Sequence, residues 1–574
     1  MFSGMKPLPK ALIFAAGTAL VIFAGNALYK SEAIGAYLHP KATVAVSIPD
    51  KIDLPGPATA VTTSGTTIAT QAISGESLRV KTLAWNGTAG MAYAKAAGLY
   101  KAKGLNVDIK REDDYSKMTA DLAAFAKDPG QGVHFVVIMG DGYPAFAIGA
   151  NEALKPFGSK VAGIAGIGYS RGEDKCIIAG DAEPRGSLIK GVLGDGDINI
   201  CLKFASDNGI PVNADQKTYD PNAINLSGSK DFVEADQAFI ASAKANFTGG
   251  ACEDRKNVVS GAMQKVCVNG TATWTPGDTN VFNEFKKMGK SIRVLASTKE
   301  YAWQMPALVI GNAKWMASHR DVVKAFLAAT FEGGEKIRSN NAALMIASSE
   351  QAKIIGEQDA SYWAELYKGT TDTGPNGKVI SLGGSTTNGV ADAGYLFGLK
   401  GADNLFKKVY TVYGNLAVKF FPDIMPGGLL KYEEVIDTSY VSELLAASTN
   451  VAKADAPIYS AATTATFSAK TVSIEFETGK ATFTPKATAA LNDLLDQAAV
   501  TVLNVQINGH TDNVGNSTTN LTLSKARAEA VKTFLMTNSP SSFPAERVQT
   551  RGFGDTMPIG TNAQNRRVEI LLRK

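Results

Sequence analysis

The chain is poor in histidine, cysteine and net charge. It has 4 His and 4 Cys among 574 residues, with a formal net charge of +4 at pH 7. The histidines are far apart in the sequence and no Cys-x-x-Cys occurs, so no metal site is expected. The near-neutral charge lacks the basic footprint of nucleic-acid-binding proteins. Because no nucleophile–base pairing or nucleotide-binding loop stands out, the sequence predicts no enzyme and no cofactor.

Apolar residues are plentiful, and one run of them contains no charge. Hydrophobic residues make up 45% of the chain, which excludes a wholly disordered protein. Residues 11–29 are uncharged and follow Lys6 and Lys10. A helix of that length spans a hydrocarbon core of roughly 30 Å, so we expect a single-pass inner-membrane anchor with the bulk of the chain in the periplasm. Small residues at Gly25-Asn26-Ala27 leave a cleaved signal peptide, and secretion to the periplasm, as the alternative.

Export places the cysteines in an oxidising compartment. Four of them suggest two disulfides, and three pairings are open. We predict the sequence-local pairing, Cys176–Cys201 and Cys252–Cys267; buried free thiols are the alternative.

Two stretches rich in Ala, Thr and Ser divide the exported part, because such compositions bury little apolar surface and act as tethers. They are residues 39–76 and 446–466. The predicted units are therefore an anchor with a cytoplasmic tip, a linker, a large central region, a second linker and a terminal domain: residues 1–38, 39–76, 77–445, 446–466 and 467–574.

The central region alternates strand-like and helix-like segments. Strand-like runs at 78–83 and 105–109 and an apolar run at 134–139 are separated by helix-like stretches. This order predicts βαβ units with a buried parallel sheet. Ligands of such sheets bind beyond the carboxyl ends of the strands, where Trp, Tyr, Asn and Asp occur here.

The order of GLYKAKGLNVDI (98–109), DDYSKMTADLAAF (113–125), ATWTPGDTN (272–280) and residues 291–337 resembles the nitrate/sulfonate/taurine group of ABC-transporter substrate-binding proteins. The resemblance implies a type II-like periplasmic-binding-protein fold of two α/β lobes. Lobe one would comprise 77–170 and 300–445, and lobe two 171–299.

The resemblance also implies a small-molecule cleft. We expect it to be lined by Trp85, Asn86, Tyr115, Ser116, Asp141, Tyr143, Trp274, Thr275, Trp303 and Gln304. Core packing is the alternative for the tryptophans, and a solvated turn for Asp141 and Tyr143. The family's ligands are often anions held at helix N-termini. Asp195 and Asp197 in the matching loop, with Asp141, do not suit an anion. A cationic, zwitterionic or neutral ligand, or a degenerate cleft, is as compatible with the sequence as nitrate or a sulfonate.

The terminal residues predict a small α/β sandwich of strand, helix, strand, helix and strand. Ser524 looks like an N-cap of its second helix. The strings NGHTDNVGNSTTNLTLSKARAEAVKTFL (508–535), RGFGDTMP (551–558) and NRRVEILL (565–572) closely resemble the OmpA-like peptidoglycan-binding domain. The resemblance implies that Asp512 and Arg527 hold the diaminopimelate of the peptide stem. It implies that the flanking pocket positions are Thr511, Asn513, Gly515, Asn520, Leu521 and Arg566. A merely structural Asp512–Arg527 ion pair is the alternative.

Together these features predict a cell-envelope protein whose partners are the inner membrane, peptidoglycan and an unknown small molecule. The alternative is a structural or motor-associated tether, in which the central region docks envelope membrane proteins rather than a solute. An ion-conducting role for the chain itself is not expected, because residues 11–29 contain no ionisable group.

Overall fold

The structure is a computed structural model of the chain and describes residues 77–448, 466–472, 474, 476–477 and 479–574. The predicted anchor at 11–29, the first linker and most of the second lie outside these residues. Within the described part, no helix has both the length and the apolarity needed to cross a membrane. The anchor therefore stays a prediction.

Lobe one of the central region is built on a six-stranded sheet in the order β17-β4-β14-β3-β1-β2. β1 (Leu78–Thr82) runs parallel to β2 (Val107–Arg111) and to β3 (Phe135–Met139), as the βαβ pattern predicts. β14 (Pro306–Asn312) is antiparallel to β3 and to β4 (Val161–Ser170), so the chain returns to this sheet after leaving it. β17 is Ser385–Thr387.

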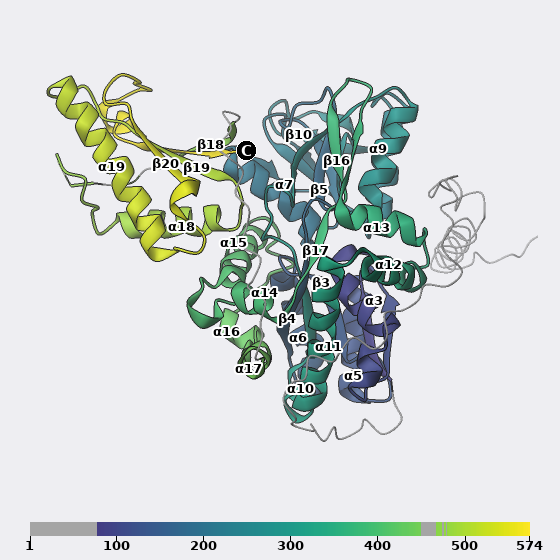
Figure 1. Cartoon of the computed structure of the whole chain (residues 1–574). Coiled ribbons are helices and arrows are strands. Elements are labelled where there is room, and N and C mark those ends of the chain that lie inside the picture. Colours follow the sequence, from purple (N-terminus) through teal and green to yellow (C-terminus); the bar gives the residue numbers. More distant parts are fainter. Residues whose placement is uncertain (1–76, 449–465, 473, 475, 478) are drawn as a thin grey trace, which may run out of the picture. The chain divides into compact units, whose positions relative to one another are not determined.

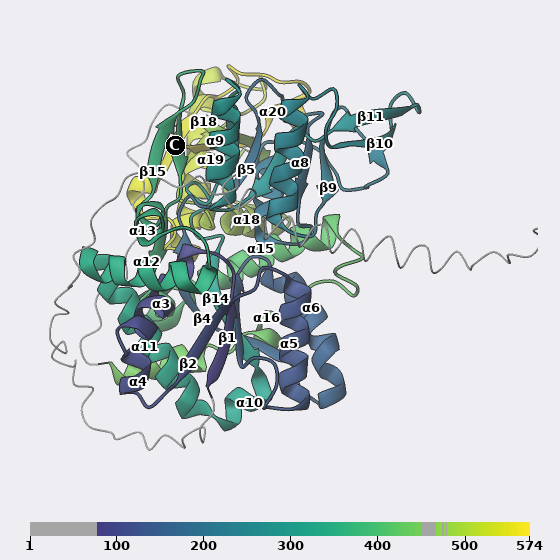
Figure 2. The ribbon, with the colours of Figure 1, turned by 90° about the vertical axis from the view of Figure 1, so that its right-hand side faces the viewer.

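Helices cover both faces of this sheet. Figure 2 shows α5 (Tyr115–Lys127) and α6 (Tyr143–Leu154) beside β1 and β2 on one side, with α3 (Ala89–Ala96) and α11 (Arg320–Ser339) on the other. The central strand β3 is buried along its whole length, as expected for a sheet covered on two faces. The short helix α4 (Leu99–Ala102) precedes β2. The helices of the region's later part (Figure 1) are α10 (Ala313–Ser318), α12 (Asn341–Ile355), α13 (Ala360–Lys368), α14 (Val390–Leu396), α15 (Leu405–Phe420), α16 (Tyr432–Val435) and α17 (Ser439–Ala447).

Lobe two has its own six-stranded sheet in the order β13-β5-β12-β6-β9-β7. The strands are β5 (Lys175–Ala179), β6 (Leu188–Gly191), β7 (Val212–Asn213), β9 (Ile224–Gly228), β12 (Gly270–Thr273) and β13 (Ile292–Ser297). The helices are α7 (Gly196–Asp207), α8 (Phe232–Lys244) and α9 (Gly277–Lys287). A separate small sheet joins β8 (Thr218–Tyr219), β10 (Cys252–Asn257) and β11 (Met263–Cys267).

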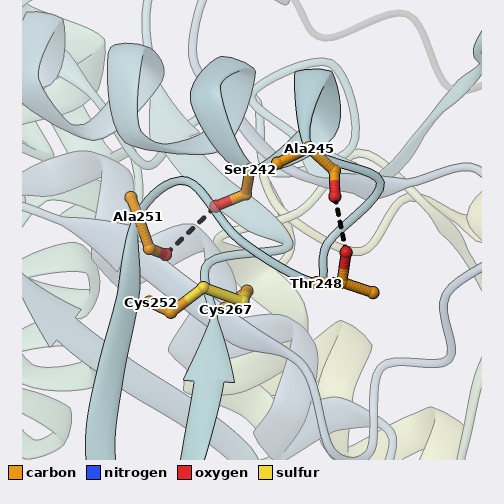
Figure 3. The surroundings of a disulfide bond; sticks show 6 residues. All are labelled: Ser242, Ala245, Thr248, Ala251, Cys252 and Cys267. Atoms are coloured by element: carbon orange, nitrogen blue, oxygen red, sulfur yellow. Dashed lines mark hydrogen bonds between the residues drawn. A yellow bond between two sulfur atoms is a disulfide. The ribbon is translucent and has the colours of Figure 1, made fainter.

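Both disulfides lie in lobe two. Cys176 of β5 is bonded to Cys201 of α7, and both are fully buried. Cys252 and Cys267 join the two ends of the β10–β11 hairpin, where Ser242 also donates to the Ala251 carbonyl at 3.0 Å (Figure 3). These are the two pairs that the sequence predicts.

Two crossing segments, residues 171–174 and 298–305, connect the lobes. The Thr298 hydroxyl ties them together, since it lies 2.5 Å from the Ser170 hydroxyl and accepts the Gly172 amide at 2.9 Å. The Thr298 amide in turn donates to the Asp174 carbonyl at 3.1 Å. The two segments are thus bonded side by side and form part of the hinge between the lobes.

One predicted lobe boundary is wrong. The hairpin of β15 (Thr370–Thr373) and β16 (Val379–Leu382) falls in the range 300–445 that the sequence assigns to lobe one. In the structure Leu382 belongs to the apolar core of lobe two, and Asp372 pairs with Lys286 of α9 at 2.8 Å. The chain therefore crosses to lobe two once more, because the apolar face of this short hairpin finds its partners there.

The terminal domain has a four-stranded sheet in the order β18-β21-β19-β20. The strands are β18 (Thr466–Val472), β19 (Asn504–Gly509), β20 (Val548–Gly552) and β21 (Val568–Arg573). The helices are α18 (Ala487–Ala499), α19 (Ser517–Asn538) and α20 (Asn562–Asn565). β20, which pairs in parallel with β19, is an addition to the predicted strand–helix–strand–helix–strand order.

Candidate functional site

In the terminal domain Asp512, the centre of the pocket that the sequence predicts, lies in the loop between β19 and α19. Its Oδ2 accepts a hydrogen bond from Arg566 Nη1 at 2.6 Å, and its Oδ1 accepts the Val514 amide at 3.3 Å. The Asp512 side chain is 13% exposed and that of Arg566 is 49% exposed. Asp512 is thus an ionic partner at the surface rather than a core residue.

Arg527, on α19, does not pair with Asp512 in the described structure. Its Nε donates to the Lys480 carbonyl at 3.1 Å, and its guanidinium lies 4.9 Å from the centre of the Phe476 ring. Burial and the neighbouring Arg566 lower the pKa of Arg527, while Asp512 opposes that shift. Three charged groups therefore lie within electrostatic reach of one another: one carboxylate and two guanidinium groups.

The loop that carries Asp512 is shaped by polar contacts. Asn520 of α19 donates to the carbonyls of Asp512 and Val514, both at 3.2 Å, so it holds the loop over the helix. The Thr511 amide donates to the Gly554 carbonyl at 2.8 Å, and its buried hydroxyl has no hydrogen-bond partner within the described residues. Gly515 adopts a φ of +95°, which a glycine tolerates, and Leu521 is exposed at the rim. Asn513 has no side-chain contact that bears on the pocket.

A close approach of helix to strand sets the distance between Asp512 and Arg527. A Cβ at Gly509, the last residue of β19, would lie 2.0 Å from the Ser524 carbonyl oxygen of α19. A Cβ at Gly552, on β20, would lie 2.7 Å from the Lys525 amide nitrogen. Only glycine fits at these positions, because the obstacles are backbone atoms.

We expect Gly509→Ala to displace α19 from the sheet, weaken peptidoglycan retention and destabilise the domain by about 2–3 kcal/mol. The measurements are retention on isolated cell wall and thermal unfolding followed by circular dichroism. Gly560→Ala is the matched control, since the nearest atoms to its Cβ would belong to the Gln564 side chain rather than to the backbone. Equal behaviour of the two variants would show that this contact does not set the pocket.

In the central region, side chains from both lobes meet beside the hinge. Tyr115 of lobe one donates its hydroxyl to Asp195 Oδ1 at 2.6 Å, and Asp195 precedes α7 of lobe two. Gln304, in a crossing segment, donates to Asp141 Oδ2 at 2.7 Å and to the Gly196 carbonyl at 3.2 Å. Asp141 follows β3 of lobe one, so the network joins both lobes and the hinge.

Other predicted cleft residues also make contacts across this boundary. Trp274 of lobe two donates its indole N–H to the Ala84 carbonyl of lobe one at 3.2 Å. Asn86 donates to Glu173 Oε1, in the first crossing segment, at 2.7 Å. Trp85 is buried, and its indole N–H has no hydrogen-bond partner within the described residues. Thr275 is buried in lobe two, where it donates to Asp278 at 2.9 Å.

Three predicted cleft residues lie elsewhere. Tyr143 directs its hydroxyl into lobe one, where it donates to the Val435 carbonyl at 2.6 Å. Trp303 packs edge-on against Tyr169 with ring centres 5.5 Å apart, beside Arg171. Ser116 is exposed in the first turn of α5, and only its amide is used, for the helix cap. In each case the hydrogen bond, ring contact or helix cap lies away from the residues that meet beside the hinge.

Sequence reasoning missed Glu173, Asp174 and Tyr413 at this boundary. Tyr413 of α15 donates to Gln304 Oε1 at 2.8 Å and so orients the amide that holds Asp141. Glu173 accepts from Asn86 and also from Ser385 at 2.6 Å. The signal in the sequence is Glu173-Asp174-Lys175, a charged triplet placed directly before a buried strand.

Burial raises the pKa values of the carboxyl groups at this boundary. The pKa of Asp195 is raised to about 6 and that of Asp174 to about 7. The pKa values of Asp141 and Asp197 are raised well above the ordinary range, by burial and by the other carboxylates nearby. The four groups thus disfavour simultaneous ionisation when the lobes are closed.

Comparison with known proteins finds relatives of the terminal domain in sequence and a likeness of the central region in fold. Residues 475–570 match the OmpA family. Over 108 residues the chain is 35% identical to the probable lipoprotein YiaD of Escherichia coli, which is 17% of this chain and 47% of that protein. Over 81 residues it is 41% identical to the photosystem I P700 chlorophyll a apoprotein A2 of Gloeobacter violaceus, which is 12% of this chain and 9% of that protein. The chain thus spans half or less of the length of these curated relatives.

The solved structure of the periplasmic nitrate-binding protein NrtA from Synechocystis PCC 6803 matches with a TM-score of 0.43 at 10% identity, covering 65% of this chain and 89% of that protein. Residues 475–570 thus match the OmpA family, as the sequence predicts, and the central region resembles periplasmic binding proteins in its fold.

Proposed function

We propose that this protein is a membrane-anchored envelope receptor. Its OmpA domain binds peptidoglycan without a covalent bond, and its two-lobed region binds a small solute. The proposed anchor is the uncharged run at 11–29, which would place the rest of the chain in the periplasm. Two linkers, 39–76 and 446–466, would let the wall-bound and solute-binding modules move independently of the membrane.

The observation that carries the wall-binding half is the grouping of Asp512, Arg527 and Arg566. The free end of diaminopimelate carries an ammonium and a carboxylate side by side. Asp512 would pair with the ammonium, and a planar guanidinium can hold the carboxylate through two parallel hydrogen bonds. Arg527 is suited to the second role because its Nε is already fixed by the Lys480 carbonyl, which leaves its terminal nitrogens to face the ligand.

Asp512→Ala and Arg527→Ala should each reduce retention of the full-length protein on isolated peptidoglycan by about 10-fold or more. The first removes the partner of the ligand's ammonium group, and the second removes the partner of its carboxylate. The measurement is co-sedimentation with purified cell wall across a range of wall concentrations.

Arg551→Ala is the matched control for these variants. Arg551 is an exposed arginine on β20 of the same domain, and its side chain makes no hydrogen bond or ion pair with the residues that the structure describes. Its substitution should leave retention unchanged. Wild-type retention by both pocket variants would contradict the assignment, whereas equal loss in Arg551→Ala would show that binding follows net charge alone.

Support for the solute-binding half comes from the polar network beside the hinge. Tyr115 and Asp141 of lobe one meet Asp195 of lobe two and Gln304 of a crossing segment at one place. A ligand held there would contact both lobes, and its binding energy could therefore bias them toward closure. The competing function is a tether whose central region docks partner proteins, and the experiment in the next subsection separates the two.

A further inference from the structure

The strongest unexplained feature of the molecule is a group of four buried carboxyl groups between the lobes. This interlobe carboxyl cluster consists of Asp141, Asp174, Asp195 and Asp197. Asp174 is fully buried, and the other three residues are 2–3% exposed. They come from lobe one, the hinge and lobe two in turn, and the inference below rests on the solute-binding function proposed above.

Most acceptor oxygens of the cluster have no donor. Both carboxylate oxygens of Asp174, both of Asp197 and Oδ1 of Asp141 are buried without a hydrogen-bond partner within the described residues. Buried polar atoms are nearly always paired, and an unpaired one destabilises the fold by about 1–3 kcal/mol. Asp174 and Asp197 can share one proton between them, which satisfies only some of these five oxygens. The remaining ones point to donors that are not part of this chain.

A neutral side chain gives the same indication independently. Asn199, on the first turn of α7, is 1% exposed. Its Nδ2 lies 3.3 Å from the Asp141 carbonyl and 3.4 Å from Asp141 Oδ2, while its Oδ1 has no partner within the described residues. An acceptor that is not a carboxylate is thus also left without a donor at the edge of the cluster.

The arrangement is unsuited to an anion. The N-terminus of α7 would be the natural anion site, but Asp195 Oδ1 already accepts the Gly196 amide at 2.7 Å. Asp197 adds a second carboxylate to the same turn. The chain's own side chains therefore occupy the place where an anionic ligand would bind, and they would repel it.

The site therefore favours a cation over an anion. The kind of donor that the cation carries, a metal ion or N–H groups, decides its chemical class. Among the described residues no three His, Cys, Asp or Glu are arranged to hold a metal ion. Lys175, the cation next to Asp174 in the chain, is engaged by Asp278 at 2.5 Å. Charge-assisted N–H···O⁻ bonds are the strong way to satisfy several carboxylate oxygens at once.

We propose that the interlobe carboxyl cluster is the recognition site for an organic cation with several N–H donors, a primary amine or a guanidinium compound. The cation would replace the missing donors to Asp141, Asp174 and Asp197. Because these residues lie on both lobes and the hinge, it would bind as the lobes close over it.

The test is calorimetric titration of the full-length protein with two matched sets of probes. Putrescine, spermidine and agmatine are the cations; nitrate, sulfate and methanesulfonate are the anions; calcium chloride controls for a metal. Thermal unfolding by tryptophan fluorescence is the second readout, because all 5 tryptophans (Trp85, Trp274, Trp303, Trp315 and Trp363) lie in the central region.

Asp197→Asn and Asp141→Asn should weaken binding of the best amine at least 10-fold without loss of folding, since each removes a charge and keeps the side-chain shape. Asp236→Asn is the matched control. Asp236 is likewise buried, but its two oxygens accept from Thr271 and Thr273 at 2.8 Å within lobe two. Its variant should bind amines as the wild type does.

The outcomes separate this inference from the function it rests on. Amine binding that is lost in Asp197→Asn and retained in Asp236→Asn supports the inference. Binding of an anion or of calcium in place of amines overturns the cation class but leaves solute binding intact. Amine binding unchanged in Asp197→Asn overturns the site. No heat or stabilisation with any probe overturns both and favours the partner-docking tether.

Discussion

Replacement of Lys175 by Met should lower the free energy of unfolding of the central region by about 3–5 kcal/mol, because it leaves a buried carboxylate without its counter-ion. Lys175 begins β5 directly after the first crossing segment, and its ammonium lies 2.5 Å from Asp278 Oδ2. The two side chains are 2% and 0% exposed. Asp278 also accepts from Thr275, but that hydroxyl carries no charge. Chemical denaturation followed by tryptophan fluorescence measures the effect.

An exposed ion pair on the same lobe provides the control. Lys286 and Asp372 lie 2.8 Å apart with side chains 44% and 42% exposed, so Lys286→Met should change the stability by less than about 1 kcal/mol. A similarly small loss in Lys175→Met would mean that water reaches Asp278 and that the hinge does not depend on this pair.

The stability of the unliganded central region should fall by about 3 kcal/mol between about pH 6.5 and about pH 8.5. Burial raises the pKa of Asp174 to about 7 and that of Asp236 to about 8. A carboxyl whose folded pKa lies above its unfolded value binds its proton more tightly in the folded state. Its contribution is complete below the unfolded pKa and is lost as the pH rises through the folded one.

The pH range of this experiment is chosen to exclude histidine. Burial lowers the pKa of His134 to about 3, so its contribution has the opposite sign, but it changes little above its unfolded pKa of about 6.5. Around Asp174 other charged and titratable groups share the titration. They are the carboxyl groups of Asp141, Glu173, Asp195 and Asp197, and the charge of Lys175 opposes the rise in the pKa of Asp174.

Two variants show which groups cause the fall in stability with rising pH. Asp236→Asn should remove the part that belongs to lobe two and leave the part that belongs to the interlobe carboxyl cluster. Asp197→Asn should instead change the part that belongs to the interlobe carboxyl cluster and leave that of lobe two, because Asp197 interacts directly with Asp174. Denaturation curves at a series of pH values measure both. A stability that is flat or rising over this interval in the wild type would contradict the raised pKa values.

The sequence predicts those parts of the molecule whose patterns are local. The parallel pairing of β1 with β2 and β3 follows from apolar runs separated by helical segments, and the structure has it. The OmpA domain is recognised from spacings within about 100 residues. Such features depend on residues that are close in the chain, so they can be predicted without knowledge of the tertiary contacts.

Features that depend on distant partners were not predictable. Tyr143 follows the end of a strand, where a cleft residue is expected, yet its hydroxyl donates to the carbonyl of Val435, 292 positions away. Ser524 looks like an N-cap, but α19 begins at Ser517 with Asn516 as its cap. The Ser524 hydroxyl instead accepts the Gly554 amide at 2.9 Å, a contact that only the packing of β20 creates.

The pairing of Asp512 with Arg566 has a consequence for how the protein would hold the wall. In the proposed binding mode an incoming ammonium must displace the exposed Arg566 from Asp512, so one ion pair is exchanged for another. The net gain at a single site is then modest and the bound state short-lived. Stable attachment would then depend on many molecules that each bind and dissociate repeatedly. The wall could grow and be remodelled while the population of molecules stays bound to it.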